Sequence, residues 1–186
     1  MGPPGSGKGT QGMRLAGALG IPHIAVGDLL RDEVESGTER GQEFAAIMQR
    51  GELIPDDVIT ELITPVVIEA ARAGGFILDG FPRTLVQAVN ARQAADAANV
   101  DADLVIWLDV PPRDLIDRLL GRAEEQGRSD DTAEAVSRRL QVYEEATRPL
   151  LDYYRGRGLL VEVDASKSPD EVNQALLQVV DLHRPA

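Results

Sequence analysis

The sequence predicts an α/β fold in which a parallel sheet is covered by helices on both faces. Three observations lead to this prediction. Short apolar runs of strand length alternate with longer helix-like segments, a glycine-rich segment near the N-terminus leads directly into a helix, and the 186 residues match one compact domain. Strands separated by long helices pair in parallel through right-handed crossovers, which gives a sheet with two covered faces.

Each element of the first half has a local signal in the sequence. Gly20 is expected to end the first helix, and Asp28 is expected to be the N-cap of the second. Pro65 is expected to kink the long fourth helix. The predicted elements are, in order, a helix at Thr10–Leu19, a strand at His23–Val26, helices at Asp28–Glu35, Glu39–Arg50 and Asp56–Ala73, a strand at Phe76–Leu78 and a helix at Leu85–Ala98.

The second half continues the alternation of strands and helices. The polar segment Gly121–Asp131 is expected to be a loop. Strands are predicted at Leu104–Val110 and Leu159–Val163, and helices at Leu115–Leu120, from Thr132 to about Tyr154 with Pro149 inside, and at Pro169–Leu182. Ligands of open α/β sheets bind beyond the carboxyl ends of the strands, so three segments are expected to converge there: Gly5–Thr10, Asp79–Arg83 and Val110–Arg113.

Composition and charge exclude several classes of function. The formal net charge of −12 argues against broad binding of nucleic acids or anionic membranes, so any anion site must be local. No stretch is long and apolar enough to span a bilayer, and no linker divides the chain, which predicts a single domain over residues 1–186. The absence of cysteine excludes disulfides and thiolate zinc sites, and cytoplasm is the expected location.

The N-terminal segment has the pattern of a phosphate-binding loop. Gly2, Gly7 and Lys8 match G-x-x-x-x-G-K, in which glycines let backbone N–H groups face phosphate oxygens and the lysine adds a positive charge. The helix that follows directs its positive end to the same place. The usual hydroxyl residue directly after the lysine is replaced by Gly9, and the hydroxyl comes one residue later, at Thr10.

A buried strand normally precedes such a loop, but only Met1 stands there in this sequence. A strand with about five buried apolar side chains contributes roughly 8 to 15 kcal/mol, at ~1.5 to 3 kcal/mol each, which is comparable with the stability of a whole domain. From the sequence we therefore expect the natural protein to begin several residues upstream. An intact mass of native protein equal to that of this chain would refute this expectation.

Several spaced motifs together resemble an adenylate kinase of the nucleoside monophosphate kinase family. They cover nearly the whole chain: MGPPGSGKGTQ at 1–11, GDLLR at 27–31, LDGFPRT at 78–84, LLGR at 119–122, GRSDD at 127–131, RRLQVY at 138–143 and VDASK at 163–167. The resemblance implies a doubly wound parallel sheet of the P-loop NTPase type. It also implies a helical flap over the nucleoside monophosphate at residues 25–54 and a short lid over ATP at residues 121–131 that closes during turnover.

The resemblance assigns most of the cationic side chains to phosphate groups. Arg118 would stack on the ATP adenine, and Lys167 would offer its backbone carbonyl to the same base. Arginine suits phosphate because its planar guanidinium can hold two oxygens at once. The implied ATP-binding residues are Gly5, Ser6, Gly7, Lys8, Gly9, Thr10, Arg118, Arg122 and Lys167, and the implied catalytic residues are Lys8, Arg83, Arg122, Arg128 and Arg139.

The acceptor site implied by the resemblance is where the sequence departs from the family pattern. Adenylate kinases usually have Thr before the Gly-Asp pair of the second motif, whereas this chain has Val26. One lost hydrogen bond is worth ~0.5 to 1.5 kcal/mol, or roughly tenfold in affinity, and Gln87 still matches the glutamine that meets the adenine edge. The implied AMP-binding residues are Val26, Arg31, Glu52, Leu53, Ile54, Gly80, Phe81, Pro82, Arg83, Gln87, Arg128 and Arg139.

Two carboxylates are candidates for holding Mg²⁺ through water. Asp79 ends an apolar strand beside Gly80, which suits that role, and the resemblance extends it to Asp28. No zinc site is expected, because the predicted lid is short and the chain has no cysteine. With only His23 and His183 and no cysteine, triad-type nucleophilic catalysis is poorly supported, and His23 is expected to be a packed or surface residue.

The leading functional hypothesis is reversible transfer of a phosphoryl group from MgATP to AMP, giving two ADP. The protein is expected to act on these small molecules as a monomer, without nucleic acid or membrane. Two alternatives remain open at this stage. A UMP/CMP kinase would share the phosphate loop and the arginines and would differ in its acceptor, and a nucleotide-binding module without turnover would bind but not transfer.

Overall fold

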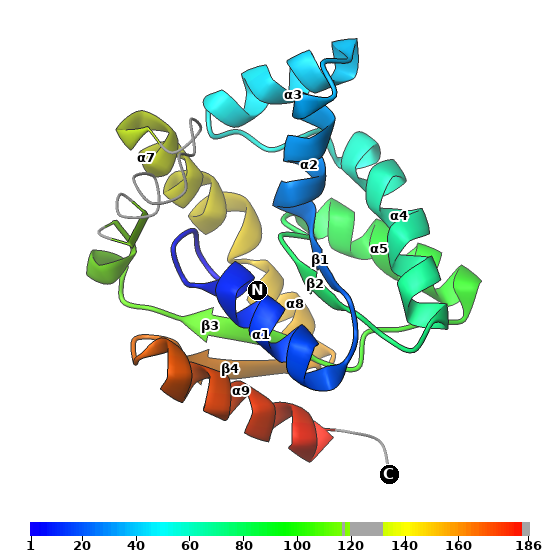
Figure 1. The fold of residues 1–186 in the computed structure, drawn as a ribbon, viewed down its shortest axis with the longest axis vertical. Helices are drawn as coiled ribbons and strands as arrows, with labels where there is room; N and C mark the ends of the chain where they lie inside the picture. Colours follow the sequence, from blue (N-terminus) through cyan, green and yellow to red (C-terminus); the bar gives the residue numbers. More distant parts are fainter. Residues whose placement is uncertain (117, 120–131, 184–186) are drawn as a thin grey trace.

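The computed structural model describes residues 1–116, 118–119 and 132–183 of the chain. Strands and helices alternate, and parallel pairing confirms the α/β class (Figure 1). Strands β1 (His23–Ala25) and β2 (Ile77–Asp79) pair in parallel, with Ile24 opposite Leu78. Strands β3 (Val105–Asp109) and β4 (Leu160–Asp164) pair in parallel with Leu108 opposite Val163. Each strand begins and ends within one residue of its predicted bounds.

The two strand pairs are not joined by hydrogen bonds in the described part of the chain, so the expected single sheet is divided between β2 and β3. Met1 lies along β3, at the edge where the two strand pairs are separated. Its ammonium group donates to the carbonyl of Ile106, and its own carbonyl accepts the N–H of Leu108 at 3.0 Å. Burial lowers the pKa of this ammonium group to about 6, although Asp79 acts to raise it.

The helices before β2 form largely where predicted. Helix α1 (Lys8–Leu19) ends at Gly20, whose φ of 69° suits a glycine after a helix. Helix α2 spans Val26–Glu35, helix α3 spans Glu39–Gln49 and helix α4 spans Asp56–Arg72 with Pro65 inside it. The prediction that Asp28 is an N-cap is wrong: α2 begins two residues earlier, its N-cap is Ala25, and Asp28 lies in its first turn.

The later helices differ from the prediction at two places: the helix predicted at Leu115–Leu120 begins at residue 112, and the long helix predicted from Thr132 is divided. Helix α5 has the predicted bounds, Leu85–Ala98, because the Thr84 hydroxyl accepts the N–H of Gln87 and caps it. The long helix predicted from Thr132 is divided into α7 (Ala133–Val142), a π-helical segment η1 (Tyr143–Thr147) and α8 (Leu150–Gly156). Residues 112–116 and 118–119 are helical, and α9 spans Pro169–His183.

Apolar clusters hold the two strand pairs to their covering helices. One cluster joins α1, β3, β4 and α9 around Leu15, Leu108, Val163 and Leu176. A second joins α2, α3, α4 and the segment after β2, and contains Val26 and Phe81. Figure 1 shows α1 running between the strand pairs. Residues of both clusters also line the cleft described below, so the packing of the core fixes the walls of the site.

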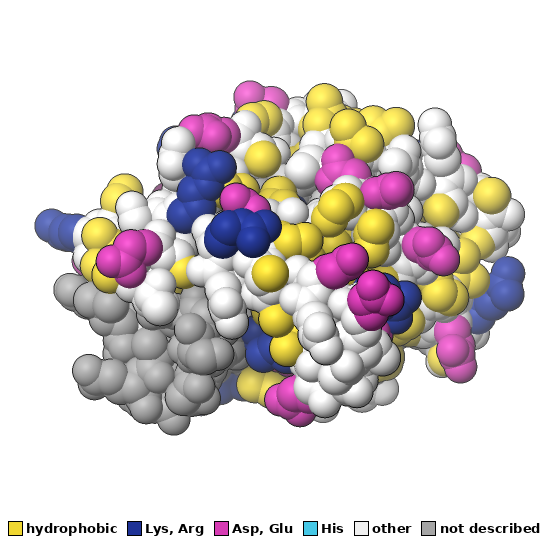
Figure 2. Space-filling model, turned by 90° about the horizontal axis from the view of Figure 1, so that it is seen from above, with side chains coloured by type: hydrophobic (Ala, Val, Ile, Leu, Met, Phe, Trp, Pro, Cys, Tyr) yellow, Lys and Arg dark blue, Asp and Glu magenta, His cyan; other side chains and the backbone are white. Residues whose placement is uncertain are grey.

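The surface agrees with the acidic composition. On the face in Figure 2, acidic side chains are spread among apolar and neutral ones rather than gathered in one patch. None of the helices in the described residues is both long and apolar enough to cross a membrane.

Candidate functional site

A cleft of about 740 Å³ opens where the glycine-rich loop faces the segment after β2. The start of α2, the end of α7 with η1, and the segment between β4 and α9 also line it. The cleft brings together every described residue of the predicted site: Gly5, Ser6, Gly7, Lys8, Gly9, Thr10, Val26, Asp28, Arg31, Glu52, Leu53, Ile54, Asp79, Gly80, Phe81, Pro82, Arg83, Gln87, Arg118, Arg139 and Lys167.

The glycine-rich loop has a backbone that other residues adopt poorly. Gly5 and Gly7 have φ angles of 84° and 86°, and a Cβ at Gly5 would lie 2.8 Å from the carbonyl oxygen of Leu115. Helix α1 begins directly after Gly7, so its unpaired N–H groups face the cleft. Lys8 Nζ donates to the carbonyl of Pro3 at 3.2 Å. This arrangement suits an anion with several oxygens, such as a phosphate chain.

Ser6 adds an unsatisfied polar group to this loop. Its side chain is 2% exposed, and within the described residues its hydroxyl oxygen has no hydrogen-bond partner. A buried hydroxyl without a partner costs about 1 to 3 kcal/mol, so a ligand oxygen that pairs with it would recover this loss.

Arg83 is half-buried on the opposite wall, and its position is fixed from two sides. Its Nε donates to the carbonyl of Gly80 at 2.8 Å, and the hydroxyl of Thr147 donates to its backbone carbonyl at 2.9 Å. Burial lowers the pKa of its guanidinium, and Asp79 acts in the opposite direction. The nearby charges of Arg139 and Arg31 lower this pKa further.

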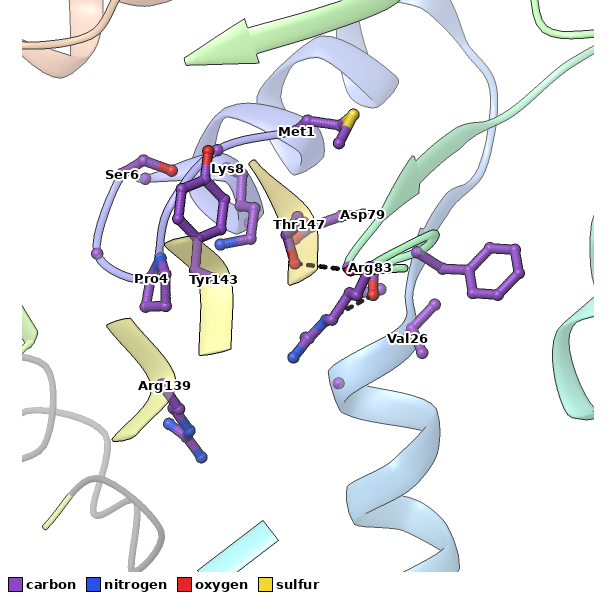
Figure 3. Close-up of a pocket in the computed structure, with 18 of the residues that line it drawn as sticks. Met1, Pro4, Ser6, Lys8, Val26, Asp79, Arg83, Arg139, Tyr143 and Thr147 are labelled. Carbon is purple, nitrogen blue, oxygen red and sulfur yellow. Dashed lines mark hydrogen bonds between the residues drawn. The ribbon is translucent and has the colours of Figure 1, made fainter. Parts of the chain in front are cut away.

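Cations thus gather on facing walls of one cleft in a protein of net charge −12. Figure 3 shows the side chains of Lys8, Arg83 and Arg139 around the same open space. Like charges at a buried position are unfavourable unless an anion offsets them. The arrangement is therefore suited to bind polyanions, and it places positive charge where a phosphoryl group could pass between two ligands.

Asp79 lies at the carboxyl end of β2 and lines the cleft. Its Oδ2 is 4.0 Å from Nε2 of His23, and its Oδ1 is buried without a hydrogen-bond partner in the described part of the chain. An available carboxylate oxygen beside a phosphate-binding loop fits a hydrated divalent cation. Among the described residues no group of three acidic or histidine side chains is placed to hold a metal ion directly.

The other carboxylate predicted to hold Mg²⁺ has a different environment. Asp28 forms an ion pair with Arg31 one turn later in α2, and its side chain is 62% exposed.

His23 is packed, as expected: its side chain is 12% exposed, and a Cβ at Gly12 would lie 2.6 Å from its Nε2.

The wall predicted to hold the acceptor base is apolar around a buried amide. Val26 is 1% exposed and packs in the cluster that contains Leu30, Ile54 and Phe81. Gln87 is 2% exposed; its Oε1 accepts the backbone N–H of Arg83 at 2.7 Å. This wall can hold a flat ring with one donor and acceptor group at its edge.

Several sequence expectations lie elsewhere or outside the described residues. Arg122 and Arg128, with the predicted lid at residues 121–131, fall in the part of the chain that the structure leaves undescribed. Arg118 lines the cleft and donates to the carbonyl of Ala165 at 3.1 Å. The segment Val110–Arg113, expected to converge on the site, is not among the described lining residues, and the Arg113 side chain is 86% exposed.

Sequence reasoning missed residues that reach the site from η1. Thr147 and Tyr143 line the cleft, and the hydroxyl of Tyr143 accepts the indole N–H of Trp107 at 3.1 Å. Tyr143 lies within a quoted motif, but no local pattern marks Thr147, because its partner Arg83 is 64 residues away.

Comparisons with known proteins agree with this geometry. A family model described as "Adenylate kinase" matches residues 1–159. A curated protein of Stenotrophomonas maltophilia named adenylate kinase is 44% identical over 180 residues, which cover 97% of this chain and 96% of the relative. Adenylate kinase of Thermus thermophilus is 48% identical over 172 residues, 92% of this chain and 90% of that protein. With the phosphate loop and the arginines in one cleft, these matches show that the chain belongs to the adenylate kinase family.

Proposed function

We propose that the protein catalyses the reversible transfer of the γ-phosphoryl group of MgATP to AMP, giving two molecules of ADP. The observation that carries this proposal is the placement of Arg83, Arg31 and Arg139 opposite the loop of Lys8 in one cleft. Two polyanions can be held there with their phosphates facing each other. Family membership supports the same reaction.

The chemistry needs positioning rather than a strong base. A phosphate oxygen of AMP is already anionic at neutral pH; it forms a bond to the γ-phosphorus while the bond from that phosphorus to the β,γ-bridging oxygen breaks, and ADP leaves. Lys8 and Arg83 would stabilise the negative charge of the group in transit. Arg139 would act at the same point, and Arg31 would hold the phosphate of AMP.

The donor nucleotide would lie along the glycine-rich loop. The N–H groups of Gly5–Thr10 and the hydroxyl of Ser6 would hold its phosphates, and Arg118 and Lys167 would contact its adenine. We assign residues 25–54 as the flap over AMP, and residues 121–131, with Arg122 and Arg128, as a short lid over ATP. Closure of such segments excludes water and prevents transfer to it.

We infer that Mg²⁺ accompanies ATP and that Asp79 holds it through water. The cation would neutralise charge on the β- and γ-phosphates. The partnerless Oδ1 of Asp79 among the described residues supports this role. Asp28 stays a second candidate, although its carboxylate already pairs with Arg31.

Transfer from MgATP to AMP, CMP, UMP and GMP, measured in parallel, tests the proposal. We expect AMP to be the preferred acceptor, with Lys8→Ala as the inactive control. Preference for UMP or CMP would make the protein a pyrimidine nucleotide kinase, and binding of ATP without transfer to any acceptor would make it a binding module. Light scattering with and without nucleotides would check the expectation of a monomer.

A further inference from the structure

Gln87 is held by two partners at opposite ends of its side-chain amide. Its Oε1 accepts the backbone N–H of Arg83 at 2.7 Å, and its Nε2 donates to Oδ1 of Asp56 at 2.8 Å. The same carboxylate oxygen accepts the hydroxyl of Thr84 at 3.0 Å. Asp56 is the first residue of α4, so the start of one helix is connected to the start of α5.

These partners determine which end of the amide is oxygen. A backbone N–H can only donate, and a carboxylate can only accept. Rotating the Gln87 amide by half a turn would place its oxygen against the Asp56 carboxylate and its NH₂ group against the Arg83 N–H. Both contacts would be repulsive, so the chemistry of the two partners allows one orientation.

Asp56 stands behind the amide rather than in the site. Among the described residues that line the cleft, Gln87 is present and Asp56 is not. An amide group offers two N–H donors and two acceptor lone pairs, and the protein uses one of each. One N–H of Nε2 and one lone pair of Oε1 remain for a ligand at the cleft wall, and the positions of this donor and this acceptor are fixed.

We propose that Asp56 is a positioning residue that sets base selectivity by fixing the order of donor and acceptor in the Gln87 amide. This inference rests on the proposed function, in which the amide meets the edge of the acceptor base. A fixed amide matches a base with an amino group beside an unprotonated ring nitrogen, as in adenine and cytosine. A base with a carbonyl beside a ring N–H, as in hypoxanthine, guanine and uracil, needs the reversed order.

AMP and IMP form the matched ligand pair for the test. They differ in this edge alone, since the amino group and bare ring nitrogen of AMP become a carbonyl and a ring N–H in IMP. Asp56→Asn is the matched variant because its amide can either accept from Gln87 or donate to it, so that only the backbone N–H of Arg83 still favours one orientation. Asp57→Asn is the control: it removes the same charge from the same turn of α4, at an exposed position.

The readout is the ratio of IMP to AMP dissociation constants, measured by calorimetry so that it does not depend on turnover, together with the corresponding ratio of kcat/KM. In Asp56→Asn we expect the preference for AMP to fall by at least ~10-fold, with the KM for ATP unchanged. Asp57→Asn should keep the wild-type ratio. A double variant, Asp56→Asn with Gln87→Met, should show no further loss of preference than Gln87→Met alone, because Asp56 acts through Gln87.

An equal loss of affinity for AMP and IMP in Asp56→Asn would show a merely structural role and overturn the proposal, as would an unchanged ratio. If Asp56→Asn does not fold, Asp56→Ser carries the same expectation, since a hydroxyl can also both donate and accept. Failure of the proposed function is distinguishable: the wild type would transfer no phosphoryl group to any acceptor, while the calorimetric ratio would still test the role of Asp56.

Discussion

The phosphate end and the acceptor end of the cleft differ in how their polar groups are satisfied. At the acceptor end, Arg83 and Gln87 are both held by hydrogen bonds from the protein. At the phosphate end, Ser6 Oγ and Asp79 Oδ1 are buried without partners in the described part of the chain. Under the proposed function, the acceptor site is therefore formed before its ligand arrives, whereas the phosphate site is completed by its ligand.

The largest expected effect comes from removing charge at the transfer point. Lys8→Ala and Arg83→Ala should each lower kcat/KM by at least ~10²-fold without loss of the fold, because each removes positive charge from the phosphates in transit. Steady-state kinetics and circular dichroism measure the two parts of this prediction. Arg92→Ala is the control, since Arg92 pairs with Asp96 and Asp101 away from the cleft. Wild-type activity in either cleft variant would refute the site.

A smaller effect is expected from the partnerless carboxylate. Asp79→Asn should raise the Mg²⁺ concentration for half-maximal rate by ~10-fold, because residues that orient a hydrated metal ion typically contribute that much. Asp28→Asn should change it less, since Asp28 is 62% exposed and pairs with Arg31. Mg²⁺ titration of the rate at fixed ATP measures both. Equal effects would mean that the two carboxylates share the ion.

The hydrogen bond from η1 offers a test of the preformed acceptor end. Thr147→Val removes the donor to the Arg83 carbonyl and should raise the KM for AMP by roughly fivefold, which corresponds to the ~1 kcal/mol of one hydrogen bond. The KM for ATP should stay the same. Thr147→Ser keeps the hydroxyl and should behave like the wild type. A change in the KM for ATP alone would contradict the division of the cleft.

The smallest effect on activity is expected at Val26. The sequence suggests that Val26→Thr modestly strengthens AMP use, and the structure adds that the new hydroxyl would be buried, since Val26 is 1% exposed. Burying a hydroxyl among apolar side chains costs about 1 to 3 kcal/mol unless it is paired. We therefore expect lower stability in denaturant, partly recovered at saturating AMP, and a change of only a few-fold in KM. Unchanged stability would place the hydroxyl in contact with a polar partner.

Features of the molecule that depend on local sequence could be predicted. Helix α5 has the predicted bounds because its capping threonine is adjacent in sequence, and the Gly5–Lys8 loop is recognised by its own residues. Features that depend on distant partners could not. The break in the helix after Val142 comes with a π-helical segment that no periodicity marks, and the hydroxyl of Thr147 in that segment donates to the carbonyl of Arg83, 64 residues away.

The site shows the same limit. Lys8, Arg31, Arg83 and Arg139 were found because each belongs to a short motif, and the cleft brings them together. Asp56 was predicted only as the first residue of a helix. Its bond to the Gln87 side chain spans 31 residues, and it exists only because α4 and α5 begin side by side.

The half-buried arginines of the cleft also connect the stability of the protein to the supply of its ligands. Without a bound anion, desolvation of the charged Arg83 guanidinium raises the free energy of the native state; the charges of Arg139 and Arg31 add to this cost, and Asp79 offsets part of it. A nucleotide that binds only the folded chain adds about 2.7 kcal/mol of stability at one hundred times its dissociation constant. In a cell with depleted nucleotides, more of the chain would unfold and be degraded, so the amount of enzyme would follow the size of the nucleotide pool that it serves.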